Sequence, residues 1–198
     1  TTLTSLGLNM GYLILNVVQD GNIYLTGLLV MIMSTILGMG VPGVAAYVIV
    51  QAVAVPVLIE VNVLPICAHM FCLIYACLSN ITPPVAMSAY VASGIAGSNQ
   101  TKTGLLSVRL GLIGFLIPFF FLDNPILLIG SVAGFAVLET LWTAITAAVG
   151  TVALVGGLEG WFLRKSNLLE RVLLVAVAPL MLLPGWKTDI IGGAVLLV

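Results

Sequence analysis

The sequence predicts an all-α integral membrane protein, and three observations lead to this class. Of its 198 residues, 61% are hydrophobic and only 7% are charged, whereas a soluble domain carries about a quarter charged residues. Charged residues are absent between Asp20 and Glu60, and again between Glu60 and Lys102. Since about 20 apolar residues cross a bilayer as a helix, gaps of this length predict segments at membrane depth. A net charge of −1 with only six Lys and Arg residues excludes nucleic-acid binding, which needs a basic face.

The first charge-free stretch, residues 21–59, predicts a re-entrant helical hairpin. Its centre carries Gly38, Gly40, Pro42 and Gly43, and glycines and a proline at this density interrupt a helix. Two arms of about 16 residues remain, each about 24 Å long, so neither comfortably crosses a hydrocarbon core of about 30 Å. A turn at the opposite water surface would usually carry a polar residue, and this turn has none. A pair of full spans is the alternative.

The second charge-free stretch, residues 61–101, predicts a discontinuous transmembrane helix. Near its middle Thr82 precedes two adjacent prolines, which cannot continue the helix before them. We expect the two arms to lie near residues 64–78 and 84–97. Thr82 is expected to be the N-cap of the second arm and Pro83 its first helical residue.

The remaining sequence predicts further helices and short polar connections. The number of helices between the turn at Asp123 and the basic loop is left open as one or two. In order, we expect a polar loop at residues 98–103, a span over about residues 104–122, a turn at Asp123, Asn124 and Pro125, hydrophobic helices up to Leu163, a basic loop at residues 164–171, and a last pair of helices divided at residues 184–187.

The distribution of Lys and Arg predicts the orientation of the chain in the membrane. We place the loops that carry most of the basic residues in the cytoplasm: Lys102, Arg109, Arg164, Lys165 and Arg171. The acidic residues Asp20, Glu60 and Asp123 then lie outside, so that the hairpin enters and leaves from the external face. Lys187 is the one basic residue against this scheme.

The three cysteines and the single histidine are expected to be packing residues. Cys67, Cys72 and Cys77 are spaced by five, which places successive thiols about 140° apart on a helix. His69 lies among them, but the spacing matches no zinc pattern. We therefore expect neither a metal site nor a disulfide here, and a histidine whose hydrogen bonds are satisfied.

The two interrupted segments predict a transporter. In hydrocarbon an unpaired backbone group costs several kcal/mol, so irregular backbone persists only where it is buried in protein or lines a cavity. Unwound carbonyls and helix C-terminal ends can coordinate Na⁺, while the N-terminal ends of half-helices face anionic groups. Ser79, Asn80 and Thr82 add side-chain oxygens, which hard cations prefer. Kinking without function is the alternative.

Several motifs resemble the large permease subunit of tripartite ATP-independent periplasmic (TRAP) transporters. The resemblance covers most of the chain and is strongest to fused permeases that work with TAXI-type binding proteins. The motifs are Gly-Met-Gly-Val-Pro at residues 38–42, Ala-Ala-Tyr at 45–47, Ala-His-Met-Phe at 68–71 and Ser-Asn-Ile-Thr-Pro-Pro-Val-Ala at 79–86, with residues 161–164, 167–171, 184–186 and 188–192 in the tail.

This resemblance implies the second inverted repeat of an elevator-type permease. Residues 1–125 would form the second half of the transport and scaffold repeat, and residues 126–198 a C-terminal transmembrane helical extension. The implied activity is Na⁺-coupled uptake of an organic acid, a carboxylate, delivered by a periplasmic binding protein at the inner membrane. The first residue is Thr and no leader is visible, so we expect a fragment that lacks the remaining N-terminal part of the permease and does not transport alone.

The resemblance also implies roles for individual residues. The family often has Thr where Gly43 stands, so a hydroxyl ligand is missing at the hairpin tip while backbone carbonyls remain. Carried over by position, ion-coordinating backbone would come from Gly38, Gly40, Val41, Ser79, Thr82 and Val85, and Pro42, Gly43, Asn80 and Pro83 would lie beside the substrate.

Two other function classes are compatible with a hydrophobic, helical chain. A non-transporting structural or scaffold subunit would use the interrupted helices only as kinks. An intramembrane enzyme would need a nucleophile and a base within reach of each other. Ser79, Ser88 and His69 are the nearest candidates, and no paired motif joins them.

Overall fold

The computed structural model describes a helical protein, as the sequence predicts. Apart from loops and one pair of two-residue strands, the described backbone is helical. By length and composition, three of the described helices could cross a membrane: Gly43–Glu60, Gln100–Phe120 and Thr140–Glu159. The chain divides into two compact units, residues 1–122 and 123–198, and the functional division at residue 125 stays a prediction. The described residues are 9, 12–14, 22–123, 125–128, 137–162, 164–182 and 192–193.

Helices α2 (Ile23–Gly38) and α3 (Gly43–Glu60) form a helical hairpin. Asn22 begins α2, because its side chain accepts hydrogen bonds from two amides of the first turn. The turn lies at residues 39–42, as the glycines and the proline predict. The expected arm length of about 16 residues is met by α2, whereas α3 has 18 residues and is about 27 Å long.

The second stretch is also interrupted where the sequence predicts it. Helix α4 (Pro65–Leu78) continues into the 3₁₀ turn η1 (Ser79–Ile81), and a new helix, α5 (Met87–Ala96), begins only after a further connection. We call residues 79–86 the break. The first arm is confirmed, while the second begins three residues later than expected.

The predicted start of the second arm is wrong. Pro84 disfavours helical geometry at the residue before it, so Pro83 cannot be the first residue of a helix. The Thr82 hydroxyl does not cap α5 but donates back to the Leu78 carbonyl at 2.8 Å. Ala86, with a left-handed φ of 32°, immediately precedes α5.

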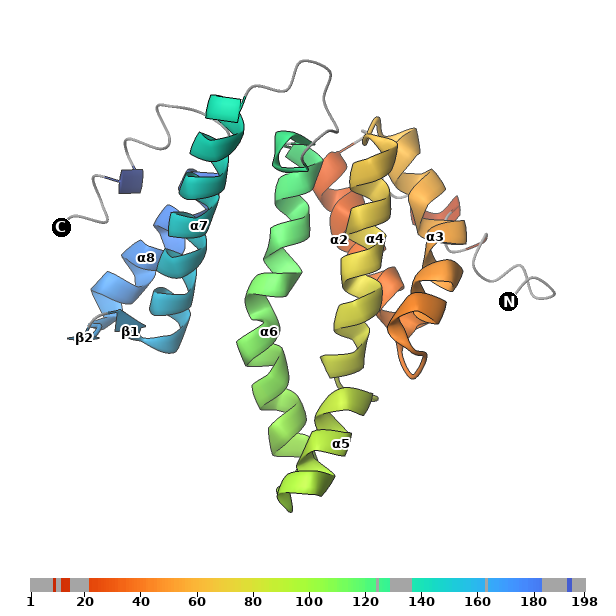
Figure 1. Ribbon diagram of the computed structural model, residues 1–198, viewed down its shortest axis with the longest axis horizontal. Helices are drawn as coiled ribbons and strands as arrows, with labels where there is room; N and C mark the ends of the chain where they lie inside the picture. Colours follow the sequence, from red (N-terminus) through yellow and green to blue (C-terminus); the bar gives the residue numbers. More distant parts are fainter. Residues whose placement is uncertain are drawn as a thin grey trace. The chain divides into compact units, whose positions relative to one another are not determined.

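Helix α6 (Gln100–Asp123) runs along α4, the break and α5 (Figure 1). A side chain at Gly111 would lie 2.5 Å from Ile81, and one at Gly114 would lie 3.1 Å from Leu78. Gly111 and Gly114 therefore serve close helix packing. Since Gly111 stands near the middle of this 24-residue helix, the break lies level with the midpoint of α6.

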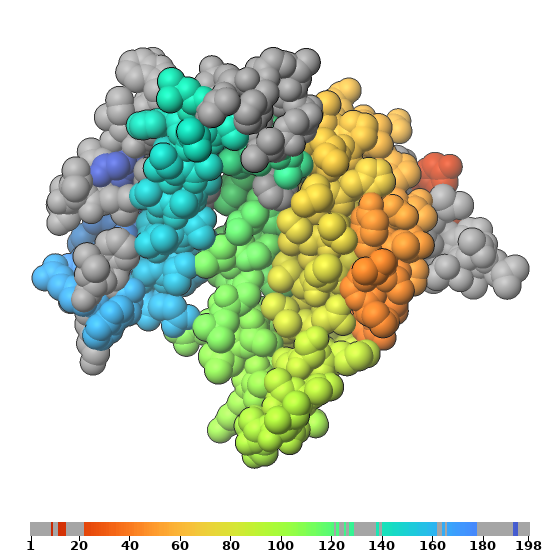
Figure 2. All heavy atoms as spheres, in the orientation of Figure 1, coloured from red at the N-terminus to blue at the C-terminus, as the bar shows by residue number. Residues whose placement is uncertain are grey.

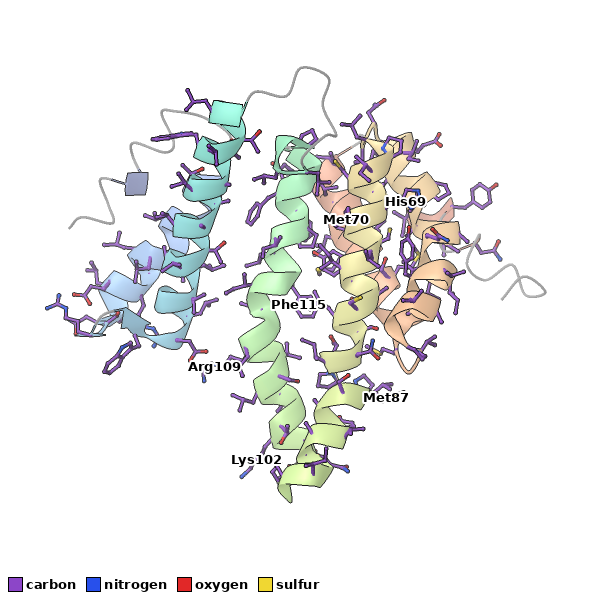
Figure 3. The ribbon with its side chains drawn as sticks, in the orientation of Figure 1. His69, Met70, Met87, Lys102, Arg109 and Phe115 are labelled. Carbon is purple, nitrogen blue, oxygen red and sulfur yellow. The ribbon has the colours of Figure 1, made fainter. Side chains whose placement is uncertain are left out.

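Aromatic side chains hold α4, which precedes the break, against the C-terminal half of α6. Phe71 packs against Tyr75 and Phe119 with ring centroids 4.7 Å and 5.5 Å apart, in the edge-to-face geometry that aromatic rings prefer. The Tyr75 hydroxyl donates to the Phe115 carbonyl at 2.5 Å. Figure 3 shows Phe115 between the two helices. This cluster fixes the rotation of α4 relative to α6.

The second unit contains one helical pair, α7 (Val137–Glu159) and α8 (Leu168–Leu182), which pack side by side (Figure 1). A short 3₁₀ turn, η2 (Pro125–Leu127), precedes them, and the paired strands β1 (Trp161–Phe162) and β2 (Arg164–Lys165) connect them. One helix thus occupies residues 137–159. Residues 129–136 and the helix expected after residue 187 lie outside the described residues, apart from residues 192–193.

Candidate functional site

The tip of the α2–α3 hairpin meets the break between α4 and α5. A Cβ atom built on Gly38 would lie 2.7 Å from the Ser79 hydroxyl oxygen and 3.3 Å from the Ala76 carbonyl oxygen. On the other side of the turn, a Cβ atom on Gly40 would lie 3.6 Å from the Val85 side chain. Figure 2 shows the atoms of the hairpin turn against those of the break. The structure thus brings together the two interruptions found in the sequence.

This junction lies halfway along α6. The break is level with Gly111 and Gly114 at the middle of that helix. Near the base of the hairpin, Gly27 faces Phe119 and Leu122, close to the end of α6. The hairpin therefore starts at one end of α6 and turns back near its midpoint, about 18 Å from either end. Figure 1 shows the start of α2, the end of α3, the start of α4 and the end of α6 at one end of this unit, with the α5–α6 turn at the other.

The hairpin turn leaves three main-chain oxygens without a donor. Gly40 has φ 77°, a conformation that residues with a Cβ adopt only with strain. The Val41 amide donates to the Gly38 carbonyl at 3.3 Å. In the described part of the chain, nothing donates to the carbonyls of Met39, Gly40 and Val41.

At the break, two side-chain hydroxyls donate to carbonyl groups in the last turn of α4. Ser79, which is fully buried, donates to Ala76 at 2.6 Å, and Thr82 donates to Leu78 at 2.8 Å. Because a hydroxyl that donates its proton still has two lone pairs, the oxygens of Ser79 and Thr82 remain available as ligands of a cation. The Asn80 amide nitrogen lies 3.4 Å from the Cys77 carbonyl.

Further carbonyls of the break differ in whether they have a partner. Ser107 of α6 donates to Ile81 at 3.0 Å, and Tyr90 of α5 donates to Pro84 at 3.0 Å. The sequence reasoning missed Ser107 and Tyr90. The available signal was the spacing of small residues at positions 104, 107, 111 and 114, which share one face of a helix. Among the described residues, none donates to the carbonyls of Asn80, Pro83 and Val85.

Among the described residues of the first unit, no charged side chain belongs to this junction. The sequence has none between Glu60 and Lys102, and Lys102 and Arg109 are exposed and point away from α4 and α5 (Figure 3). Within the residues that the structure describes, no three His, Cys, Asp or Glu side chains gather as a metal site. The ligands that the junction offers are neutral oxygens, which suit a hard monovalent cation better than a transition metal.

The residues expected beside the substrate lie around the same junction but on different sides. Pro42 is exposed at the hairpin turn, and a Cβ atom on Gly43 would lie 3.4 Å from the Cys77 sulfur. Asn80 is half-buried. The Pro83 ring is close to α6, 3.5 Å from a Cβ atom built on Gly104, so its ring does not face the hairpin.

His69 has a hydrogen-bond partner and Cys67 and Cys72 are buried, as expected of packing residues, whereas Cys77 is exposed. His69 of α4 is hydrogen-bonded through Nδ1 to the Tyr47 hydroxyl of α3 at 2.8 Å. The three cysteines lie in α4 and are free thiols. The Ser79 hydroxyl is engaged by Ala76, and no hydrogen bond among the described residues joins His69 to Ser79 or Ser88. The pair that an intramembrane hydrolase requires is therefore not assembled by these residues.

Two interrupted helical segments meeting at the midpoint of a long apolar helix are typical of secondary transporters. Residues 1–135 match the family model of the tripartite ATP-independent periplasmic transporter, DctM component. No curated protein and no solved structure matches the chain. The family match covers more than half of the chain, which therefore belongs to the DctM family of TRAP transporter permeases. It is a multi-pass protein of the inner membrane and a transporter component, not an enzyme.

Proposed function

We propose that this chain is part of a permease that takes up an organic acid together with Na⁺. A periplasmic binding protein delivers the acid, and the remaining N-terminal part of the permease completes the transport path. In this proposal the chain contains the second inverted repeat. The α2–α3 hairpin is re-entrant, with its tip at mid-membrane, and α4, the break and α5 form one discontinuous transmembrane helix.

One observation carries the proposal: the hairpin tip touches the break, and both contribute main-chain oxygens to which no described residue donates. Each unpaired backbone group at membrane depth costs several kcal/mol. A bound cation offsets this cost, because it replaces the missing donors for several oxygens at once. The absence of a charged side chain between Glu60 and Lys102 leaves that position to a mobile ion.

The proposed cation ligands come from both sides of the junction. Carbonyl oxygens of the turn are supplemented by the lone pairs of two hydroxyls, which are oriented because their protons are already donated to α4. The ligand residues are Gly38, Gly40 and Val41 from the tip, and Ser79, Thr82 and Val85 from the break.

The substrate carboxylate is proposed to bind beside the cation. Asn80 offers an amide group at the break, and the positive end of the α5 dipole attracts an anion. Pro42 and Gly43 would contact the acid from the hairpin, and Pro83 would lie beside it at the break, with its ring packed near α6.

The test is uptake by the complete permease, reconstituted in proteoliposomes with its binding protein. A panel of labelled carboxylates that includes C4-dicarboxylates is offered with a Na⁺ gradient or with an equal K⁺ gradient. We expect uptake of at least one acid with Na⁺ and none with K⁺. Equal uptake in both salts would overturn the assignment of Na⁺.

A substitution links the ion to the break. Thr82→Ala removes one proposed ligand and the hydrogen bond to Leu78, and it should raise the half-saturating Na⁺ concentration roughly tenfold. The matched control is Thr103→Ala, since Thr103 also donates to a carbonyl four residues earlier, at 3.0 Å, but lies at the start of α6. Unchanged transport after combined replacement of Asn80 and Thr82 would favour a structural or scaffold role instead.

A further inference from the structure

Ser107 connects α6 to the break. Its hydroxyl oxygen lies 2.7 Å from the Gly104 carbonyl of its own helix and 3.0 Å from the Ile81 carbonyl of the break. The single proton of the hydroxyl can serve either oxygen. In a regular helix the Gly104 carbonyl also accepts the amide four residues later, whereas Ser107 is the one donor to Ile81 among the described residues.

The sequence of α6 makes this contact possible. Gly104, Gly111 and Gly114 stand on the same face as Ser107, and a side chain at any of them would come within 3.1 Å of an atom of Leu78, Ile81 or Tyr90. The absence of these side chains lets the backbone of α6 approach the break closely enough for a short serine side chain to reach it.

The bond to Ile81 acts on a proposed ion ligand. The Ile81 carbonyl and the Thr82 amide belong to one planar peptide unit. The amide side of this unit donates to the Ser79 carbonyl at 3.3 Å, and the carbonyl side accepts the bond from Ser107. Both sides of the unit are therefore held, which fixes the direction in which the backbone leaves toward Thr82.

We propose that Ser107 is a positioning residue of the transporter: it orients the peptide between Ile81 and Thr82 and thereby the oxygens that bind the coupling ion. This inference rests on the proposed function. Without the hydroxyl, the Ile81 carbonyl is left without a donor at membrane depth, where a free carbonyl is costly. The break then rearranges, and the ion ligands lose their alignment.

The first test measures the Na⁺ dependence of uptake by the complete permease with its binding protein. Ser107→Ala should raise the half-saturating Na⁺ concentration roughly tenfold. Ser107→Thr, which keeps the hydroxyl, should return it to within about threefold of the wild type. Ser93→Ala is the matched control, because Ser93 is a buried serine of α5 that donates at 2.7 Å to a carbonyl three residues earlier in its own helix. A Na⁺ requirement that is unchanged in Ser107→Ala, or equally raised in Ser93→Ala, would overturn the proposal.

The second test does not depend on the ion. Hydrogen exchange of the purified complete permease, read by mass spectrometry over residues 79–90, reports the protection of the Thr82 amide. We expect exchange about tenfold faster in Ser107→Ala and unchanged in Ser93→Ala. Equal protection in both variants contradicts the positioning role. If wild-type uptake ignores Na⁺, the proposed function fails, and the exchange result still decides whether Ser107 holds the break.

Discussion

Two helix ends in this protein solve the same electrostatic problem in different ways. Helix α7 and helix α4 both end with carbonyl groups that accept hydrogen bonds from side chains. At the end of α7, the Arg171 guanidinium of α8 donates to Gly157 at 3.0 Å and to Leu158 at 2.9 Å. At the end of α4, the partners are the neutral hydroxyls of Ser79 and Thr82.

Under the proposed function, the difference separates a stabilised helix end from one that binds an ion. The Arg171 guanidinium is covalently part of the chain, so the partial negative charge at the end of α7 always has a cation beside it. The end of α4 has no such group, because the nearest basic residue along the chain, Lys102, is exposed and points away. In the proposed function, the equivalent positive charge at this end is an ion from solution. Variants at both ends test this contrast, beginning with the largest expected effect.

Gly38→Ala should abolish or strongly reduce transport. The new methyl carbon would lie 2.7 Å from the Ser79 oxygen and 3.1 Å from the Ser79 Cβ atom, so the hairpin tip must move away from the break. Overpacking of this kind costs about 1–3 kcal/mol, and we expect uptake to fall at least roughly tenfold. Uptake by the reconstituted complete permease is the measurement.

The control for this variant is Gly94→Ala in α5. A Cβ atom at Gly94 would meet nothing within 4 Å, and alanine favours a helix over glycine by roughly 1 kcal/mol. Gly94→Ala should therefore transport like the wild type. Normal transport by Gly38→Ala would mean that the tip and the break do not touch in the working protein.

Arg171→Ala should destabilise the α7–α8 pair without altering the ion requirement. The two carbonyls at the end of α7 lose their donor, and hydrogen bonds from charged groups contribute about 2 kcal/mol each. We expect a lower temperature of unfolding in a thermal-shift measurement and an unchanged half-saturating Na⁺ concentration. A changed Na⁺ requirement would contradict the view that the end of α7 has only a stabilising role.

Arg164→Ala is the matched control for that measurement. Arg164 forms an ion pair with Glu170 at 2.9 Å, but its side chain is 79% exposed. Exposed ion pairs contribute between 0 and about 1 kcal/mol. Arg164→Ala should therefore shift the unfolding temperature much less than Arg171→Ala.

Tyr75→Phe should have the smallest effect of the series. It deletes one hydroxyl, which donates to the Phe115 carbonyl, and leaves the aromatic packing with Phe71 and Phe119 in place. Because the carbonyl retains its helical donor, the cost should be near 1 kcal/mol. The unfolding temperature is the readout, and a loss as large as that of Arg171→Ala would contradict this estimate.

The positions of both interruptions could be predicted from sequence, because glycine and proline act on the backbone locally. The turn at residues 39–42 and the end of α4 at Leu78 lie where expected. The predicted start of α5 was wrong. The prediction relied on the preference of proline for the first helical turn, whereas Pro84 disfavours helical geometry at Pro83. The depth of the two interruptions in the membrane is predicted from the length and hydrophobicity of each whole segment rather than from any one residue.

The partners of the break could not be predicted in the same way. Ser107 is 26 residues from Ile81 in sequence, and the row of small residues on its helix face indicates close packing without naming the partner. Its role follows from the close approach of α6, which depends on Gly111 meeting Ile81. The residues that would bind ion and substrate were proposed from resemblance, and the structure places the tip and break residues together.

The contact between Gly38 and Ser79 joins two segments that the chain connects only through α3 and α4. An ion held by oxygens from both segments would act as a clasp between them. Its affinity for the closed arrangement would be the free energy that keeps the hairpin shut. Departure of the ion and release of the hairpin would then be coupled, so that the hairpin would open wherever the sodium concentration falls below the dissociation constant of the site.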